Sequence, residues 1–175
     1  MITGCESPVY KKAKPVPVIG FAHLNAFTVQ GGGTDIQQSF VDDARTIAVS
    51  REFGMTPAEL IKRYANNRFN VTQQPTSLVF DIKTASLKKY QEETDPLAIM
   101  TGLTNDIYKM TVLIAMHPVR DGIKKDPFTI YYEQELIISS NTSLADREYR
   151  QFEFMEDMIT DIDQSVAQIV TTKLN

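Results

Sequence analysis

Polar and apolar residues alternate along three segments of this chain. Residues 78–83, 108–117 and 128–138 carry an apolar side chain at every second position. A period of two is typical of a strand that packs one face against a core. Pro118, Asp121-Gly122 and Pro127 indicate a loop between the last two segments, so residues 107–138 are predicted to form an antiparallel hairpin. The side chains expected on the core face are Leu78, Phe80, Ile82, Tyr108, Met110, Val112, Ile114, Met116, Phe128, Ile130 and Tyr132.

Two segments have the three- and four-residue spacing of helices. Thr56-Pro57-Ala58-Glu59 combines an N-cap threonine, a proline at the first helical position and a glutamate at the third, and this capping box predicts a helix to about Asn67. Ser143 and Asp146 can cap a second, longer helix at the end of the chain. Its predicted apolar face is formed by Phe152, Met155, Ile159, Ile162, Val166 and Ile169.

The segments before the first helix are less regular. Residues 18–29 are apolar enough for a strand, which the glycines 31–33 would end. In residues 36–53, Ile36, Phe40, Ala44 and Ile47 are compatible with a short helix, but we favour a loop and a strand. Residues 88–106 are predicted to be a polar excursion between strands.

The order of these elements predicts an α+β fold. One mostly antiparallel sheet of four to five strands would bury its apolar face under two helices, as a two-layer sandwich. Residues 5–17 contain three prolines and three lysines without a periodic apolar pattern. We therefore divide the chain into an N-terminal segment that includes a flexible tether, residues 1–17, and a single domain, residues 18–175.

Composition narrows the classes of function. The net charge of −4 and the pI near 5.2 argue against a nucleic-acid-binding protein, which needs a basic surface. A single cysteine forms no internal disulfide, and no cluster of cysteine and histidine suggests a zinc site. No segment approaches the roughly 18 apolar residues of a membrane-spanning helix. We expect no metal or cofactor.

The one cysteine, Cys5, follows Ile2-Thr3-Gly4 and precedes the polar tether. This pattern is typical of the lipobox of bacterial lipoproteins, in which the cysteine thiol becomes the point of lipid attachment. We therefore expect a periplasmic protein that a lipid anchors to the inner or the outer membrane. The charged start and the apolar stretch of an export signal are missing from this sequence. The alternative is an ordinary free cysteine, which behaves as a small apolar residue.

Taken together, Cys5 and the order of elements resemble small envelope lipoproteins of Gram-negative bacteria, among them the YajG-type lipoproteins and the auxiliary lipoproteins of ABC-type lipid transport systems. The matching pieces are Thr56-Pro57, the strand beginning at Leu78, the 107–138 hairpin and the helix from Ser143. The resemblance covers roughly residues 18–175 by pattern. It implies a protein that is not an enzyme, sits on a membrane by its lipid and acts through contacts with proteins or lipids in the periplasm.

Candidate binding residues lie mainly in the hairpin. Tyr108, Tyr131, Tyr132, Glu133 and Glu135 form the candidate binding surface. Glu133 and Glu135 share one strand face, where a carboxylate pair can perform acid–base chemistry, but such pairs more often face water.

Two other features have a chemical and a structural interpretation. Glycines 31–33 with Thr34 suggest a phosphate-binding loop, although Asp35 stands where a cation would be needed, which favours a simple turn. His23 and His117 are more plausible as hydrogen-bonded strand residues than as metal ligands or bases.

Three hypotheses of function follow. The leading one is a non-catalytic, membrane-tethered domain that binds another envelope component, a protein or lipid-transport machinery. The second is a soluble protein that binds a small molecule or lipid in a groove lined by Phe80, Met110 and Phe128, with residues 88–106 as a lid. The third is an enzyme that uses Glu133 and Glu135. The first predicts a filled core with an exposed patch, the second a deep apolar cavity, and the third carboxylates with raised pKa values in a cleft.

Overall fold

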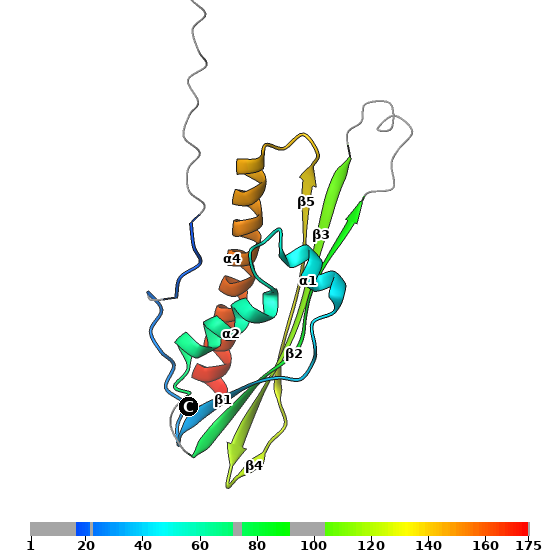
Figure 1. The fold of residues 1–175 in the computed structure, drawn as a ribbon. Helices are drawn as coiled ribbons and strands as arrows, with labels where there is room; N and C mark the ends of the chain where they lie inside the picture. Colours follow the sequence, from blue (N-terminus) through cyan, green and yellow to red (C-terminus); the bar gives the residue numbers. More distant parts are fainter. Residues whose placement is uncertain (1–16, 22, 72–74, 92–103, 175) are drawn as a thin grey trace, which may run out of the picture.

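The computed structural model describes residues 17–21, 23–71, 75–91 and 104–174 (Figure 1). Cys5 and the tether before residue 17 lie outside the described residues. The elements follow the order β1 (Gly33–Gln38), α1 (Ala44–Ser50), α2 (Pro57–Arg68), β2 (Thr76–Gln91), β3 (Asn105–Arg120), β4 (Ile123–Lys124), β5 (Phe128–Ser139) and α4 (Leu144–Ile169), which a short π-helical turn, Val170–Leu174, extends. None of the helices in these residues is long and apolar enough to cross a membrane.

The strands form one mixed sheet. β1 pairs with β2 in parallel, β2 with β3 and β3 with β5 in antiparallel fashion, and the two-residue β4 pairs with the end of β3. The helices α2 and α4 lie on the same side of the sheet in Figure 1. The predicted α+β fold with a mostly antiparallel sheet against two helices is therefore confirmed, with the seven-residue α1 as an additional element.

Alternation along the strands fills the layer between sheet and helices. Every second residue of β3 from Tyr108 to Met116 is buried, as predicted. Val112 and Ile114, in the middle of β3, pair with buried residues of both β2 and β5. From α4, the predicted Met155, Ile159, Ile162 and Val166 are buried, together with Phe154 and Met158, which the prediction did not include. Burial of these apolar side chains stabilises the two layers by roughly 1.5–3 kcal/mol for each large side chain.

The predicted caps form as the sequence indicates. The Thr56 hydroxyl accepts a hydrogen bond from the Glu59 amide at 3.1 Å, and the Glu59 carboxylate accepts one from the Thr56 amide at 2.9 Å. These reciprocal bonds satisfy two of the amide groups that a helix start leaves without partners. At the start of α4, the Ser143 hydroxyl accepts from the Asp146 amide at 3.2 Å.

The predicted hairpin is also confirmed. β3 pairs with β5 along twelve residue pairs, from Asn105 with Ser139 to Met116 with Phe128. Asp121 and Gly122 both have positive φ, 53° and 73°, which suits the tight turn between β3 and β4. Pro118, expected in the loop, lies instead inside β3 opposite Leu78.

The strand predicted over residues 18–29 is wrong. In this segment a single bridge, between Phe27 and Phe69, replaces a strand ladder. Gly31 and Gly32 lead into β1, which begins at Gly33, rather than end a strand. The backbone at Gly32 passes very close to Pro75, where a Cβ would lie 1.7 Å from the Pro75 carbonyl oxygen. The apolar residues before the glycines still contribute to the core, since Phe21 is buried against Tyr64.

The strand favoured within residues 36–53 is also wrong. Ile36 lies in β1, and residues 44–50 form α1. The reason is a cap: the Asp43 carboxylate accepts a hydrogen bond from the Thr46 amide at 2.7 Å, which satisfies the start of a helix.

The predicted excursion at residues 88–106 is shorter than expected. β2 continues to Gln91 and β3 begins at Asn105, so the ends of this segment are strand residues. Residues 92–103 lie outside the described residues.

Candidate functional site

The sheet has a second face that no described helix covers. Its side chains are the odd-numbered residues of β3 and β5 and, after a register shift near Ile82, the even-numbered residues of β2. We call this the open face. Cross-strand pairing arranges its side chains in rows: Tyr90, Ile107 and Ile137; Lys88, Lys109 and Glu135; Ser86, Thr111 and Glu133; Thr84, Leu113 and Tyr131.

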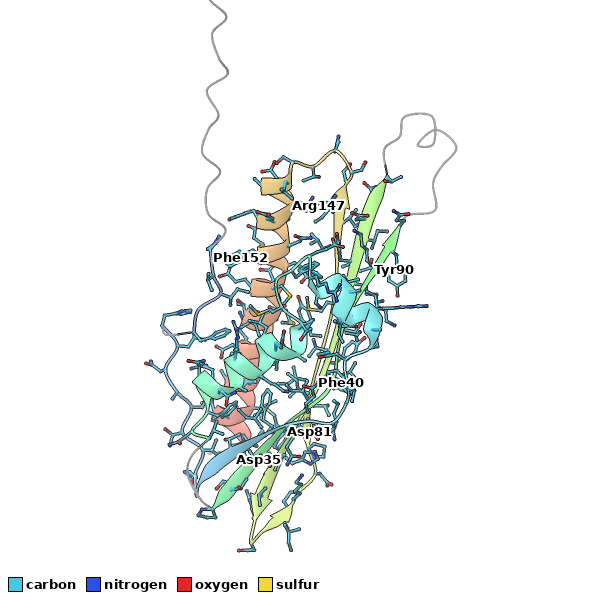
Figure 2. All side chains as sticks on the ribbon, viewed as in Figure 1. Asp35, Phe40, Asp81, Tyr90, Arg147 and Phe152 are labelled. Atoms are coloured by element: carbon cyan, nitrogen blue, oxygen red, sulfur yellow. The ribbon has the colours of Figure 1, made fainter. Side chains whose placement is uncertain are left out.

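Apolar side chains are exposed in two of these rows. Tyr90 and Ile137 are 48% and 50% exposed in the row nearest the end of β2, and Tyr131 is 63% exposed in the row with Leu113. Figure 2 shows Tyr90 toward the same end of the sheet as Arg147, and Asp81 toward the other. Single exposed apolar residues are ordinary, but neighbours in register on one face are a feature of interaction surfaces.

A charged band separates the two apolar rows. The Lys109 ammonium lies 2.8 Å from Glu133 Oε1 and 3.9 Å from Glu135 Oε1. The Tyr131 hydroxyl donates a hydrogen bond of 2.6 Å to the other oxygen of Glu133. The hydrogen bonds from Lys109 and Tyr131 lower the pKa of Glu133, while the bond to Glu133 raises the pKa of Lys109. Lys109 and Glu133 therefore form an ion pair at neutral pH.

The acid–base interpretation of Glu133 and Glu135 is wrong. It required carboxylates in a cleft with raised pKa values. Both side chains project from the open face, 39% and 53% exposed, and the pKa of Glu133 is lowered. A carboxylate that Lys109 holds ionised is a poor proton donor near neutral pH.

The structure does not bring the five residues of the candidate binding surface together. Tyr131, Glu133 and Glu135 share the open face. Tyr108 and Tyr132 point to the opposite face, where the helices pack. The alternation itself carries this information, because residues of different parity in one strand face opposite sides. The same parity would have added Ile107, Leu113 and Ile137, which sequence reasoning missed.

Tyr108, itself buried, is instead the centre of a partly exposed polar cluster. Its hydroxyl donates to Glu52 at 2.5 Å and accepts from Arg147 at 3.1 Å. Arg147 also contacts Asp106 at 2.7 Å, and Lys89 contacts both Glu52 and Asp106 at 3.2 Å. Burial and the bond to Glu52 raise the pKa of Tyr108. These contacts join the loop after α1, β2, β3 and α4, which indicates a structural role.

Asp81 is the buried carboxylate of the open face. It accepts hydrogen bonds from the Ser39 hydroxyl at 2.7 and 2.8 Å, and the Lys83 ammonium lies 2.6 Å away. Burial alone would raise its pKa, but the bonds from Lys83 and Ser39 lower it overall. The bonds from Ser39 tie β2 to the residue that follows β1, and the contact with Lys83 lies within β2.

The other residues that the sequence suggested as functional, glycines 31–33 and the two histidines, occupy ordinary structural positions. The glycines 31–33 lead into a strand, whereas a phosphate-binding loop leads into a helix. His117 Nδ1 lies 3.1 Å from the Lys125 carbonyl oxygen, within the hairpin, and His23 is exposed in the irregular segment before β1. Across the residues given a place in the structure, no group of three or more His, Cys, Asp or Glu could hold a metal ion.

The groove that the second hypothesis assigned to a small molecule or lipid is filled by core side chains. Phe80 and Met110 are fully buried in the core, and Phe128 is half-buried at its margin. A hollow of about 450 Å³ lies elsewhere, between α4 and the segments 17–19 and 51–55. It includes Phe53, Met55, Phe152 and Met155, and also Gln151, a buried residue whose amide nitrogen has no hydrogen-bond partner.

Comparison with known proteins finds structural similarity at low sequence identity. No family model and no curated protein match the chain. The solved structure of rare lipoprotein B from Shewanella oneidensis is similar to this chain, with a TM-score of 0.44. The two sequences are 18% identical, and the match covers 79% of this chain and 96% of that chain. The solved structure of a minor lipoprotein from Acinetobacter baumannii has a TM-score of 0.39 and 14% sequence identity, and the match covers 78% of this chain and 88% of that chain. Both are bacterial lipoproteins, but likenesses at these scores carry no argument about the function of this chain.

Proposed function

We propose that this protein is a non-catalytic, lipid-tethered domain of the bacterial envelope that holds a protein partner against the open face of its sheet. Cys5 carries the lipid, residues 6–17 are the tether, and residues 18–175 form the interaction domain. The location is the periplasmic side of the inner or the outer membrane. The observation that carries the proposal is the open face, with exposed Tyr90, Tyr131 and Ile137.

The chemistry of the open face favours a protein over a bilayer. A surface that enters a membrane is apolar with a basic rim, whereas this face has the Lys109, Glu133 and Glu135 band between two apolar rows. Fixed charges of both signs between apolar anchors specify the register of a protein partner. Tyrosine supplies contact area together with a polar tip, which is typical of protein interfaces.

The tether supports the proposed anchor. Twelve residues in extended form reach on the order of 40 Å, enough to let the domain meet a partner away from the bilayer surface. Lipid chains at Cys5 would contribute roughly 0.8 kcal/mol for each buried CH₂ group, and stable attachment needs more than one chain.

The anchor is tested by mass spectrometry of Cys5 from the native membrane fraction. The proposal predicts a lipid-modified cysteine and release of the Cys5→Ala variant from membranes. A free thiol at Cys5 in membrane-derived protein would remove the anchor from the proposal.

The open face is tested with two matched variants. Ile137→Lys places a charge in the exposed apolar row of the open face. Leu144→Lys makes the same kind of change at a 72% exposed residue at the start of α4. We expect quantitative co-purification of the partner from solubilised membranes to be lost with Ile137→Lys and kept with Leu144→Lys. Equal recovery with both variants would show that the partner binds elsewhere.

A second candidate function is the binding of a small amphipathic molecule. The hollow beside Gln151 favours it, since apolar side chains around a buried hydrogen-bond donor, with Arg51, Glu52 and Glu148 also in the lining, suit an apolar chain with a polar head group. Saturable binding of a fluorescent fatty-acyl probe that Phe152→Arg abolishes would support this candidate. Binding that Phe152→Arg leaves unchanged would reject it.

A further inference from the structure

The strand β5 is an edge of the sheet with one free side. It pairs with β3 along its whole length, and no other described strand pairs with it. Its twelve residues therefore present a row of backbone amide and carbonyl groups away from β3. Free strand edges pair readily with other extended chains.

A hollow of about 370 Å³ lies beside this edge. Residues 130–132 of β5 form one side and α4 forms the other, through Asp161, Ser165 and Gln168. The groups that line it on the α4 side are mainly hydrogen-bonding side chains. An extended peptide backbone, with its own donors and acceptors, suits such a lining better than an apolar chain does.

Carboxylates flank the edge from both faces of the sheet. Glu133 and Glu135 stand on the open face. On the other face, Asp161 lines the hollow together with Tyr132, and Asp157 lies one turn before it on α4. Burial raises the pKa of Tyr132, and the charges of Asp161 and Asp157 raise it further. Among the residues that the structure describes, neither Asp157 nor Asp161 forms an ion pair, and Lys109 is the only cation paired with Glu133 or Glu135.

We infer that β5 accepts an extended, basic segment of another protein as an additional strand. Side chains of a strand alternate between its faces, so lysines or arginines on one face would meet Glu133 and Glu135 and those on the other would meet Asp157 and Asp161. Backbone hydrogen bonds along β5 hold the segment, and the four carboxylates select its charge.

The charges also disfavour a second copy of this chain as the occupant. In an antiparallel pair of β5 strands with a central register, Glu133 and Glu135 of one copy would stand beside those of the other. Like charges in direct opposition across strands are destabilising. The arrangement thus disfavours self-pairing and favours a basic partner.

The test uses the whole chain and a synthetic twelve-residue peptide in which pairs of lysines alternate with valine-threonine pairs, so that lysines occur on both faces. Binding is measured by fluorescence anisotropy at low salt. Two control peptides are used: one with glutamate in place of lysine, and one with the same side chains but a backbone N-methyl group at every residue, which removes the donors on both edges of the extended chain. We expect the unmodified peptide to bind and both control peptides to lose binding by at least about tenfold, since one lacks the charge and the other the backbone donors.

A pair of double variants locates the site. Asp157→Lys with Asp161→Lys changes the charge beside β5. Glu148→Lys with Glu156→Lys makes the same net change at exposed positions of α4 that face other hollows. We expect the first pair to weaken peptide binding at least about tenfold and the second less than about twofold. Far-UV circular dichroism verifies that both fold.

Several outcomes would overturn the inference. Equal binding of the N-methylated peptide would show that β5 adds no strand. Equal weakening by the two double variants would show attraction to net charge alone. A dimer of the domain in sedimentation experiments, strengthened by Asp157→Lys with Asp161→Lys, would identify a second copy as the occupant. The inference concerns the edge of the sheet and holds whether or not Cys5 carries a lipid, so its failure is distinct from failure of the proposed anchor.

Discussion

The contact between α2 and α4 depends on a largely buried ion pair that a single substitution can break. Asp163 on α4 accepts hydrogen bonds from Arg68 Nε at 2.7 Å and Arg68 Nη2 at 3.2 Å, and from the Tyr64 hydroxyl at 2.7 Å. The side chains of Arg68 and Asp163 are 8% and 20% exposed. Asp163→Ala would leave a buried guanidinium and a buried hydroxyl without this partner.

The size of the stability loss expected for Asp163→Ala follows from these contacts. Breaking a buried ion pair by removing one partner costs about 3–5 kcal/mol. Asp163 is one-fifth exposed, so water recovers part of this, and we expect a loss of about 2–4 kcal/mol. Replacing all three groups by apolar ones, as in Tyr64→Phe with Arg68→Met and Asp163→Leu, removes the unpaired groups and should restore most of the lost stability.

The assay is urea denaturation followed by far-UV circular dichroism. With a slope of about 2 kcal/mol per molar urea, Asp163→Ala should lower the midpoint by about 1–2 M without changing the slope. Asp161→Ala, an exposed aspartate on the same helix, is the control and should change stability by less than about 0.5 kcal/mol. The reasoning is refuted if Asp163→Ala behaves like this control, or if the triple variant is no more stable than Asp163→Ala.

Three further predictions concern the ends of elements and a buried charge. Thr56→Ala removes the hydroxyl of the capping box and should lower the free energy of unfolding by about 1 kcal/mol in the same denaturation assay, and an unchanged midpoint would contradict the role of the cap. Gly32→Ala should lower the melting temperature clearly because its Cβ would meet the Pro75 backbone at 1.7 Å, whereas Gly20→Ala, with 3.9 Å to its nearest atom, should be tolerated; similar melting temperatures would show that the backbone yields at Pro75. The pKa of Asp81 is lower in the folded state than in the unfolded state. The ionised Asp81 carboxylate therefore stabilises the fold above its unfolded pKa of about 3.9, and this stabilisation is lost as the pH falls through its folded pKa. Asp81→Asn should therefore reduce the loss of stability on acidification below about pH 4, and denaturation curves of equal pH dependence for both proteins would contradict this.

The helix caps and the strand parity could be read from the sequence because each depends on neighbouring residues. Thr56, Pro57 and Glu59 define the start of α2 within four positions, and the alternation from Tyr108 to Met116 defines the buried face of β3. Both signals are local, so tertiary contacts reinforce them rather than replace them.

The segment before α2 could not be predicted in the same way. Whether residues 18–29 form a strand depends on a partner edge, and here they contact Tyr64 and Phe69 of the helical layer through side chains. The place of Gly32 is set by the Pro75 backbone, more than forty positions away. The N-cap aspartate of α1, Asp43, was the one local signal that could have replaced the predicted strand with a helix.

The candidate site was predicted in part. Glu133, Glu135 and Tyr131 lie together on the open face, but Tyr108 and Tyr132 were grouped with them by residue type, although their parity places them among the helices. Among the described residues, no helix covers the open face because α2 and α4 pack on one side of the sheet, which the pattern within any one strand does not encode.

The central claim, that a protein partner covers the open face, is tested most directly by photo-crosslinking in cells of the native host. A photoreactive amino acid is placed at Tyr131 or Ile137 on the open face, and at Tyr149 on α4 as a control of similar exposure. The account predicts that positions 131 and 137 both crosslink to the same envelope protein and that position 149 does not. Crosslinks from position 149 alone, or none from positions 131 and 137, would contradict it.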